Sequence, residues 1–257
     1  MPHDTVPLDA PTSDLSRPMP ARTPGLPETL ACILAYFVLQ FGFGGIFGMI
    51  SQLLTKAFPD GVPAYPDRII VVVMLTLCCA ATITVAFIMR RWGAARAEGG
   101  AGGLGFTHPQ GRHIATATIL GLAAPLLGGL LTQFLAGNHE VTQSVADIAG
   151  KAHLGMRIAL LPVVVLVGPL VEEVLFRGAL LSALRTRLGD GWAIALSSLI
   201  FGLVHLPDLA WLWYAVPNLV LVGVFCAWLR VRSRSIWPAF VVHAVNNSLA
   251  TVGWFIR

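Results

Sequence analysis

Long apolar runs alternate with short polar breaks along most of the chain. Seven of these runs approach or exceed the length of a membrane-spanning helix, since a bilayer crossing needs about 20 residues. They cover residues 30–54, 69–89, 113–135, 157–184, 191–206, 211–229 and 236–256. Stretches rich in Gly, Pro and Asp separate some of them, at 58–67, 98–111 and 188–191. The pattern predicts an all-α fold, a polytopic transmembrane bundle of about seven spans within a range of six to eight.

The composition supports a membrane protein and argues against a soluble domain. Of the 257 residues, 56% are hydrophobic and only 12% are charged, whereas soluble domains carry about 25% charged residues. The net charge of +4 comes from short basic clusters between apolar runs, which are typical of topology signals. We therefore expect membrane lipid as the surrounding partner and no nucleic acid. The four cysteines all lie inside apolar runs and are interpreted as packed thiols.

The chain divides into three parts. Residues 1–27 hold seven of the seventeen prolines and few apolar residues, so 1–28 is predicted to be a disordered cytoplasmic tail. Residues 29–150 are predicted to form N-terminal transmembrane helices. Residues 151–257 form the third part, which contains the polar clusters described below.

The distribution of Lys and Arg predicts the orientation in the membrane. If the N-terminus is cytoplasmic, alternate loops place eleven basic residues inside and five outside, in agreement with the positive-inside rule. The inner set is Arg17, Arg22, Arg90, Arg91, Arg96, Arg112, Arg185, Arg187, Arg230, Arg232 and Arg234, and the outer set is Lys56, Arg68, Lys151, Arg157 and Arg257. We therefore predict a cytoplasmic N-terminus.

One cluster of ionisable residues interrupts the fourth span, where "VEEVLFRG" contains Glu172, Glu173 and Arg177. A charge at mid-bilayer costs at least about 2.5 kcal/mol, so each one suggests a function. Glu173 and Arg177 are spaced i, i+4 and can pair on one face of a helix. Glu172 points about 100° away from that face. One carboxylate is thus expected to be neutralised and the other to remain for chemistry.

Two further polar pairs lie on the following spans. In "FGLVH", His205 shares a helix face with Phe201, and in "HAVNN", His243 shares a face with Asn247. Together with Glu172 they supply the groups needed to activate a water and to stabilise an oxyanion. Each has a plainer interpretation, because a membrane histidine is often only a partner in helix–helix hydrogen bonding, and the Glu–Arg pair can be a structural lock.

The glycines at 100, 102 and 105 fit the spacing G-x-G-x-x-G. A dinucleotide site of that kind needs a preceding strand and a following helix. Here the glycines follow a membrane span and an arginine cluster, so they are interpreted as a loop.

The three motifs E-E-x-x-x-R, F-x-x-x-H and H-x-x-x-N, in that order, resemble the CPBP family of intramembrane proteases (CAAX prenyl proteases and bacteriocin-processing enzymes, also called the Abi family). The match covers about residues 155 to 255. It implies that 151–257 is a catalytic transmembrane domain in a bundle whose site opens to the cytoplasmic side. It also implies an integral protein of a bacterial-type cell membrane and an endopeptidase acting on a membrane-associated or prenylated peptide or protein.

The resemblance also implies roles for single residues. Glu172 is expected to be the general base, with His205 as its partner. His243 and Asn247 are expected to surround the developing oxyanion, and Glu173 with Arg177 is expected to be the supporting pair. The implied cofactor is either none or one zinc ion held by Glu172, His205 and His243, and the sequence leaves both open.

Two rival functions remain at this point. A catalytically silent membrane scaffold or bacteriocin-immunity-type protein would retain the same motifs for packing. A proton- or ion-coupled transporter using Glu172 as a relay is disfavoured because the chain has no internal repeat of the kind transporters show.

Overall fold

The computed structural model describes residues 22–137 and 144–256, and within these residues all the regular structure is helical. The elements are α1 (Leu26–Ala57), α2 (Tyr65–Trp92), α3 (Gly111–Ala136), α4 (Ser144–Lys151), α5 (Leu154–Pro162), α6 (Gly168–Glu173), α7 (Leu181–Leu203), α8 (Val216–Ser233) and α9 (Trp237–Val252). Two π-helical segments, η2 (Val163–Val167) and η3 (Val174–Leu180), flank α6. The 3-10 turns η1 (Gly93–Ala95) and η4 (Trp213–Ala215) precede a loop and α8. The predicted all-helical polytopic bundle is confirmed.

All seven predicted spans are largely helical, and within residues 22–137 and 144–256 five helical segments are long and apolar enough to cross a membrane by themselves. One of the five, Leu154–Leu203, contains two predicted spans. The chain turns back between them at Gly189, where φ is 74° and ψ is 175°, a conformation that glycine adopts without a steric penalty. The last predicted span corresponds to α9, which has 16 residues.

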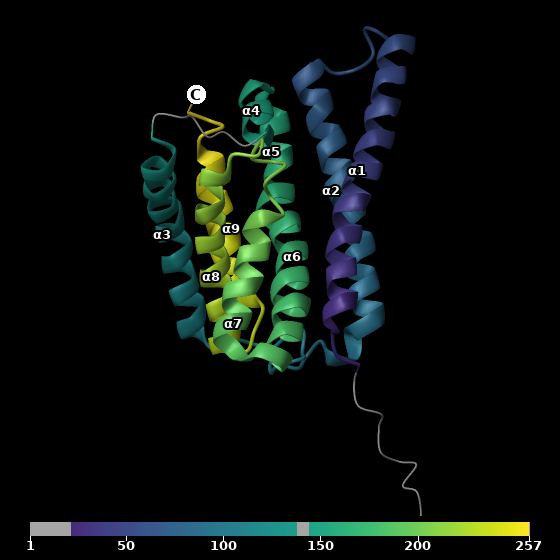
Figure 1. Ribbon diagram of the computed structural model, residues 1–257. Coiled ribbons are helices and arrows are strands. Elements are labelled where there is room, and N and C mark those ends of the chain that lie inside the picture. Colours follow the sequence, from purple (N-terminus) through teal and green to yellow (C-terminus); the bar gives the residue numbers. More distant parts are fainter. Residues whose placement is uncertain (1–21, 138–143, 257) are drawn as a thin grey trace, which may run out of the picture.

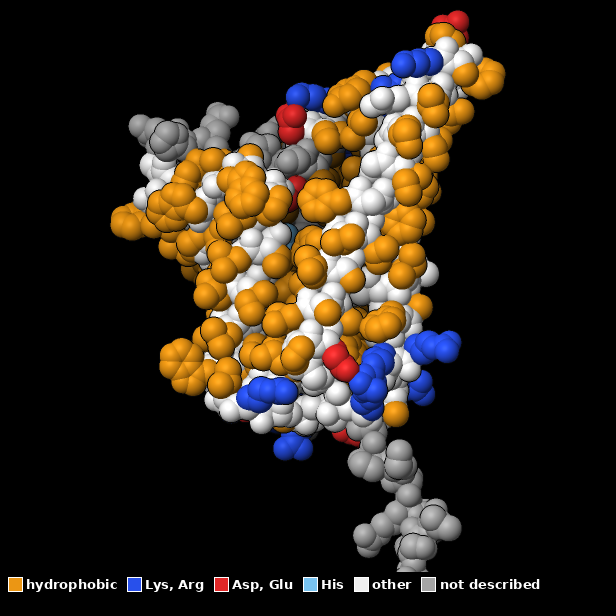
Figure 2. All heavy atoms as spheres, turned by 45° about the vertical axis from the view of Figure 1, so that its right-hand side comes forward, with side chains coloured by type: hydrophobic (Ala, Val, Ile, Leu, Met, Phe, Trp, Pro, Cys, Tyr) orange, Lys and Arg blue, Asp and Glu red, His pale blue; other side chains and the backbone are white. Residues whose placement is uncertain are grey.

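Helix α1 begins at one end of the bundle and the chain finishes at the opposite end (Figure 1). The helix bounds place most of the basic residues at the end where α1 begins. This arginine-rich end is formed by Arg22, Arg90, Arg91, Arg96, Arg112, Arg185, Arg187, Arg230, Arg232 and Arg234. The opposite end carries Lys56, Arg68, Lys151 and Arg157. Figure 2 shows hydrophobic side chains covering the flank of the bundle between the two ends. Arg17 and Arg257 lie outside the described residues, as does most of the predicted tail.

The glycine-rich loop at 98–106 is a structural connection at the arginine-rich end. Arg230 donates hydrogen bonds to the carbonyl oxygens of Gly99 (2.9 Å) and Gly103 (2.8 Å). Gly105 has a φ of +81°, and a Cβ there would lie 2.4 Å from the Arg230 guanidinium. The loop follows a helix, not a strand. Its glycines therefore serve this close contact with Arg230, and the dinucleotide motif has no structural basis.

Small residues bring the helices of the C-terminal half into close contact. A Cβ on Gly223 of α8 would lie 3.0 Å from Ser198 of α7, and one on Gly202 would lie 2.6 Å from Val220. A Cβ on Gly121 of α3 would lie 2.8 Å from Val245 of α9. Since lipid gives helices little hydrophobic reason to associate, this kind of van der Waals packing is a main source of their stability.

The N-terminal helices pack against the segment that carries the polar motifs. One cluster of buried residues joins Tyr36 of α1 and Trp92 of α2 to Phe176 of η3 and Phe201 of α7. At the opposite end, Asp67 of α2 accepts a hydrogen bond from the backbone N–H of His153, at 2.9 Å. These contacts fix the turn between α4 and α5 against α2. The predicted domain division at 150/151 falls at this turn and stays a prediction.

The clustering of the arginines yields a prediction about topology. In a variant without native cysteines, His108→Cys and Arg232→Cys should react with a membrane-impermeant maleimide only after the membrane is permeabilised, because loops rich in Arg stay cytoplasmic. Asp60→Cys, in the α1–α2 loop, should react on intact cells. Gel-shift labelling measures both, and reaction of either arginine-rich-end cysteine on intact cells would contradict the orientation.

Candidate active site

The two adjacent glutamates lie on α6, a single short α-helical stretch between the π-helical segments η2 and η3. Pro169 occupies the start of α6, and a proline there cannot donate the backbone hydrogen bond of a regular helix. π-Helical turns in membrane and soluble helices are often found at functional sites. The local irregularity thus surrounds the residues that the sequence singled out.

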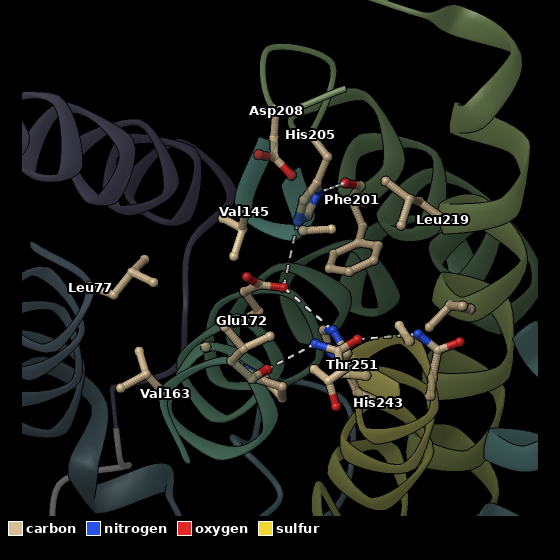
Figure 3. A pocket seen from close by; sticks show the side chains of 18 of the residues that line it. Leu77, Val145, Val163, Glu172, Phe201, His205, Asp208, Leu219, His243 and Thr251 are labelled. Atoms are coloured by element: carbon tan, nitrogen blue, oxygen red, sulfur yellow. Dashed lines mark hydrogen bonds and ion pairs between the residues drawn. The ribbon is translucent and has the colours of Figure 1, made fainter. Parts of the chain in front are cut away.

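Glu172 faces two histidines from different helices. Its Oε2 atom lies 3.7 Å from Nε2 of His205, which follows α7, and 3.7 Å from Nε2 of His243 on α9. Figure 3 shows the Glu172 carboxylate between the two rings. Both distances exceed those of direct hydrogen bonds. The three atoms therefore converge with room for a small species between them.

Glu173 and Arg177 lie behind this cluster, and both side chains are fully buried. Arg177 Nη1 donates to Glu173 Oε1 at 3.0 Å, as the i, i+4 spacing predicts. Arg177 also donates through Nη2 to the carbonyl oxygen of Gly223, at 3.1 Å, and its guanidinium lies 4.4 Å from the centre of the Phe201 ring. The same Glu173 oxygen lies 3.0 Å from Nδ1 of His243. Glu173 is thus shared by Arg177 and one of the histidines facing Glu172.

The partners of the two histidines determine which ring nitrogen carries a proton. His205 Nδ1 lies 2.7 Å from the carbonyl oxygen of Phe201, which can only accept, so Nδ1 is the donor. His243 Nδ1 faces the same Glu173 oxygen that accepts from Arg177, and is likewise the donor. In a neutral ring Nε2 is then an acceptor. Both rings are therefore oriented so that Nε2 faces Glu172.

Asn247 lies one turn beyond His243 and faces the same pocket. Its Nδ2 atom donates to the carbonyl oxygen of Val164 at 3.0 Å, and its Oδ1 accepts from Nδ2 of Asn246 at 3.2 Å. Because an amide nitrogen carries two hydrogens, one N–H is not used by Val164. The hydrogen bonds fix the amide while leaving a donor near the pocket.

A pocket of about 270 Å³ has Glu172, His205 and His243 in its wall. The other lining residues are mostly apolar and come from α4, η2, α6, α8 and the last turns of α9. Gln40 of α1 and Leu77 of α2 complete it. A wider, mainly apolar groove of about 730 Å³ between α1, α2 and the segment after α7 shares Gln40, Leu77, Val145 and Asp208 with the pocket. The reactive groups thus face a largely apolar space inside the bundle.

Sequence reasoning missed Asp208, which lines both the pocket and the groove. Burial raises the pKa of the Asp208 carboxyl, and the Glu172 carboxylate raises it further, while His205 acts in the opposite direction. The segment "HLPDLAW" (205–211) has the composition of a break between spans, so its pattern does not mark this acid as functional. Its position three residues after His205 was the available signal.

The ligand types of the cluster, two imidazoles and a carboxylate, suit zinc. Among the residues that the structure describes, no group of three or more His, Cys, Asp or Glu side chains is placed so that it could hold a metal ion. A zinc ion needs each nitrogen or oxygen ligand at about 2.0–2.2 Å. The steps proposed below are written with side chains and water, and the zinc alternative is tested separately.

Comparison with known proteins finds similarity to peptidases in the same segment. Residues 154–249 match the family model described as type II CAAX prenyl endopeptidase Rce1-like. The chain is also 28% identical over 113 residues to "Putative membrane peptidase YdiL" of Bacillus subtilis (strain 168). That match covers 44% of this chain and 42% of the relative, so less than half of the relative's length is represented. No solved structure matches the chain.

The buried pair yields a prediction about stability. Arg177→Ala leaves the Glu173 charge without its guanidinium in an apolar core, which costs about 3–5 kcal/mol. The folded yield and the melting temperature in detergent should both fall. Arg232→Ala removes an exposed arginine of the same bundle and should change the stability by about 0.5 kcal/mol or less. If Arg177→Ala melts like the wild type, Arg177 is not needed to balance Glu173.

Proposed function

We propose that this member of the CPBP family is an intramembrane endopeptidase that hydrolyses a peptide bond through a water activated by Glu172 and His205. The observation that carries the proposal is the convergence of Glu172 Oε2 with Nε2 of His205 and of His243, at 3.7 Å each, in the wall of the pocket. A structural hydrogen-bond network would instead bring these atoms into direct contact. The spacing suits a water that both groups hold.

Glu172 acts as the general base in this proposal. As the water oxygen forms a bond to the carbonyl carbon of the substrate, its proton passes to the Glu172 carboxylate. When the tetrahedral intermediate breaks its C–N bond, the same proton passes to the leaving amine. His205 holds the water from the other side, and the Phe201 carbonyl keeps the ring in the required orientation.

His243 and Asn247 are proposed to stabilise the oxyanion. The buried cluster contains two carboxylates, Glu172 and Glu173, and one guanidinium, Arg177. The 3.0 Å contact of His243 Nδ1 with Glu173 directs the Nε2 edge of the ring to the pocket. There the doubly protonated form of His243 and the amide of Asn247 are proposed to donate to the developing negative charge.

The setting of the site supports a membrane-associated substrate. The groups lie inside a bundle whose flank is apolar (Figure 2), and the pocket adjoins an apolar groove. A peptide that is lipidated or anchored in the bilayer reaches such a site without leaving the membrane. We place the protein in a bacterial-type cell membrane with its arginine-rich end in the cytoplasm, in keeping with the positive-inside rule.

The central test replaces the base. Glu172→Gln keeps the shape of the side chain and removes its ability to take a proton, so cleavage should fall by at least about 10²-fold. The assay uses the purified full chain in liposomes with internally quenched peptides, one farnesylated and one anchored by an apolar segment. A thermal melt of each variant checks folding. Glu98→Gln, at an exposed position in the loop after α2, is the matched control and should cleave like the wild type.

The losses of cleavage rate caused by substituting Glu172 and His205 should also not be additive. His205→Ala should lose a factor comparable to that of Glu172→Gln, and the double variant should be little slower than either one, because groups that act as a unit are not additive. If a well-folded Glu172→Gln cleaves at the wild-type rate, the endopeptidase mechanism is wrong and a scaffold role becomes the better explanation.

A separate experiment decides the zinc alternative. The side-chain mechanism predicts that the purified protein contains far less than one equivalent of zinc and that a chelator leaves cleavage unchanged. Elemental analysis of the wild type and of His243→Ala measures this directly. One equivalent of zinc in the wild type, lost in His243→Ala, would require a metal in the mechanism.

A further inference from the structure

A separate groove of about 450 Å³ lies between the first two helices. Its walls come from one face of α1, within residues 28–39, and one face of α2, within residues 83–92. It shares no lining residue with the pocket at Glu172 or with the wider groove beside that pocket. The α1–α2 groove is therefore a distinct feature, and the proposed peptidase chemistry does not use it.

The α1–α2 groove is open at the flank of the bundle. On α1, Ala31 and Ala35 are exposed. On the facing wall, Ile83 and Phe87 of α2 have 45% and 52% of their surface exposed. Two alanines opposite larger apolar side chains leave a depression in the surface of the helix pair. In a membrane this depression faces the acyl chains of the surrounding lipids.

The charged residues of the groove lie at one of its ends. Arg22 and Arg91 both donate to Oε1 of Glu28, at 2.5 Å and 2.6 Å. Two guanidinium groups thus share one carboxylate, which leaves one net positive charge. Their side chains are 60% and 22% exposed, and each guanidinium carries five N–H donors. Figure 2 shows basic and acidic side chains together next to the start of α1, below the apolar flank.

The length of the groove matches one leaflet of a bilayer. Glu28 and Leu39 both line it, and the helical rise places them about 16 Å apart along α1. Half of the hydrocarbon core of a bilayer is about 15 Å thick. The groove therefore runs from the arginine-rich end into the bundle for about the depth that an acyl chain occupies.

We infer that the α1–α2 groove binds one phospholipid with an anionic headgroup, its acyl chain along the groove and its phosphate at Arg22 and Arg91. Arginine suits phosphate because its planar fork matches the phosphate oxygens. The charge of the surroundings favours an anionic headgroup over a zwitterionic one. Ten described arginines at this end face three described acids, which are Glu28, Glu98 and Asp190.

The bound lipid joins α1 to α2 at a point that supports the rest of the bundle. Trp92 lines the groove, is fully buried, and belongs to the same cluster as Tyr36 and Phe176 of η3. A ligand that binds only the folded state stabilises that state. Occupancy of the groove therefore stabilises the contact between the N-terminal helices and the segment that carries the polar motifs.

Lipid competition on the purified full chain in detergent measures the headgroup preference. Phosphatidylglycerol and phosphatidylcholine with identical acyl chains are added in equal amounts, and native mass spectrometry counts the lipids retained. Phosphatidylglycerol should be retained in excess and should raise the melting temperature by about 2–4 °C when it exceeds its dissociation constant several-fold. Inorganic phosphate should leave the melting temperature unchanged, because it has no acyl chain. Equal retention of the two lipids would refute the inference.

Two variants with matched controls locate the site. Ala35→Phe fills the groove without touching the ion pairs and should abolish the retained phosphatidylglycerol, whereas Ala57→Phe, exposed at the other end of α1, should not. Arg91→Gln removes a guanidinium and should lower the excess of phosphatidylglycerol about tenfold, since hydrogen bonds to charged groups are strong. Arg232→Gln, exposed at the same end of the bundle, should retain the wild-type excess.

A melt in lipid-free detergent checks that each variant is folded. If Arg91→Gln does not fold, Arg22→Gln replaces it, at a side chain that is 60% exposed. An excess of phosphatidylglycerol that survives both the Ala35→Phe and the arginine substitution places the lipid elsewhere and contradicts the inference. A change of oligomeric state in Ala35→Phe with unchanged lipid retention also contradicts it, because the groove is then an interface between two copies of the chain.

Discussion

The site depends on the two contacts of the buried Glu173 carboxylate, one with Arg177 and one with His243. The carboxylate has no exposed surface, and one of its oxygens lies 3.0 Å from both a guanidinium nitrogen and an imidazole nitrogen. An unpaired buried charge is strongly destabilising. The positions of Glu173, Arg177 and His243 therefore depend on one another. Through His243 this constraint extends to α9, and through the bond from Arg177 to Gly223 it extends to α8. A single buried ion therefore determines how three helices meet.

Close helix packing allows the side chains of this polar cluster to reach one another. Arg177 reaches the Gly223 carbonyl because α8 lies against α7 at Ser198, where a side chain on residue 223 would not fit. Phe201 fills the space between the guanidinium and both histidine rings, with ring centres 4.8 Å from His205 and 5.6 Å from His243. The polar cluster is thus surrounded by groups that exclude lipid, which strengthens each electrostatic interaction inside it.

The sequence allowed the helices and the polar cluster to be predicted, but not which other segments line the pocket around it. Hydropathy predicts helices because a bilayer leaves few other structures possible, and the rarity of charges within spans marked Glu172 and Arg177. Their roles still await the experiments above. The depths of the groups in the bundle do not follow from the sequence, because His243 is nine residues from Arg234 whereas Glu172 is thirteen residues from Arg185. The two meet because α9 begins on the folded glycine-rich loop, where Ile236 bonds to Gly105. Asp208 was missed because tertiary folding, not local pattern, brings its loop over the pocket.

The turn at Gly189 also bears on how the site is assembled during synthesis. Glu172 and His205 lie on the two arms of one helical hairpin, Leu154–Leu203 and the residues just after it. They can meet as soon as this hairpin has inserted. His243 arrives only with α9, the last helix of the described chain. A nascent chain that has not yet inserted α9 holds Glu172 without the second histidine, and its Glu173 lacks one of its two partners. The order of synthesis thereby delays completion of the site until the bundle around it is nearly whole.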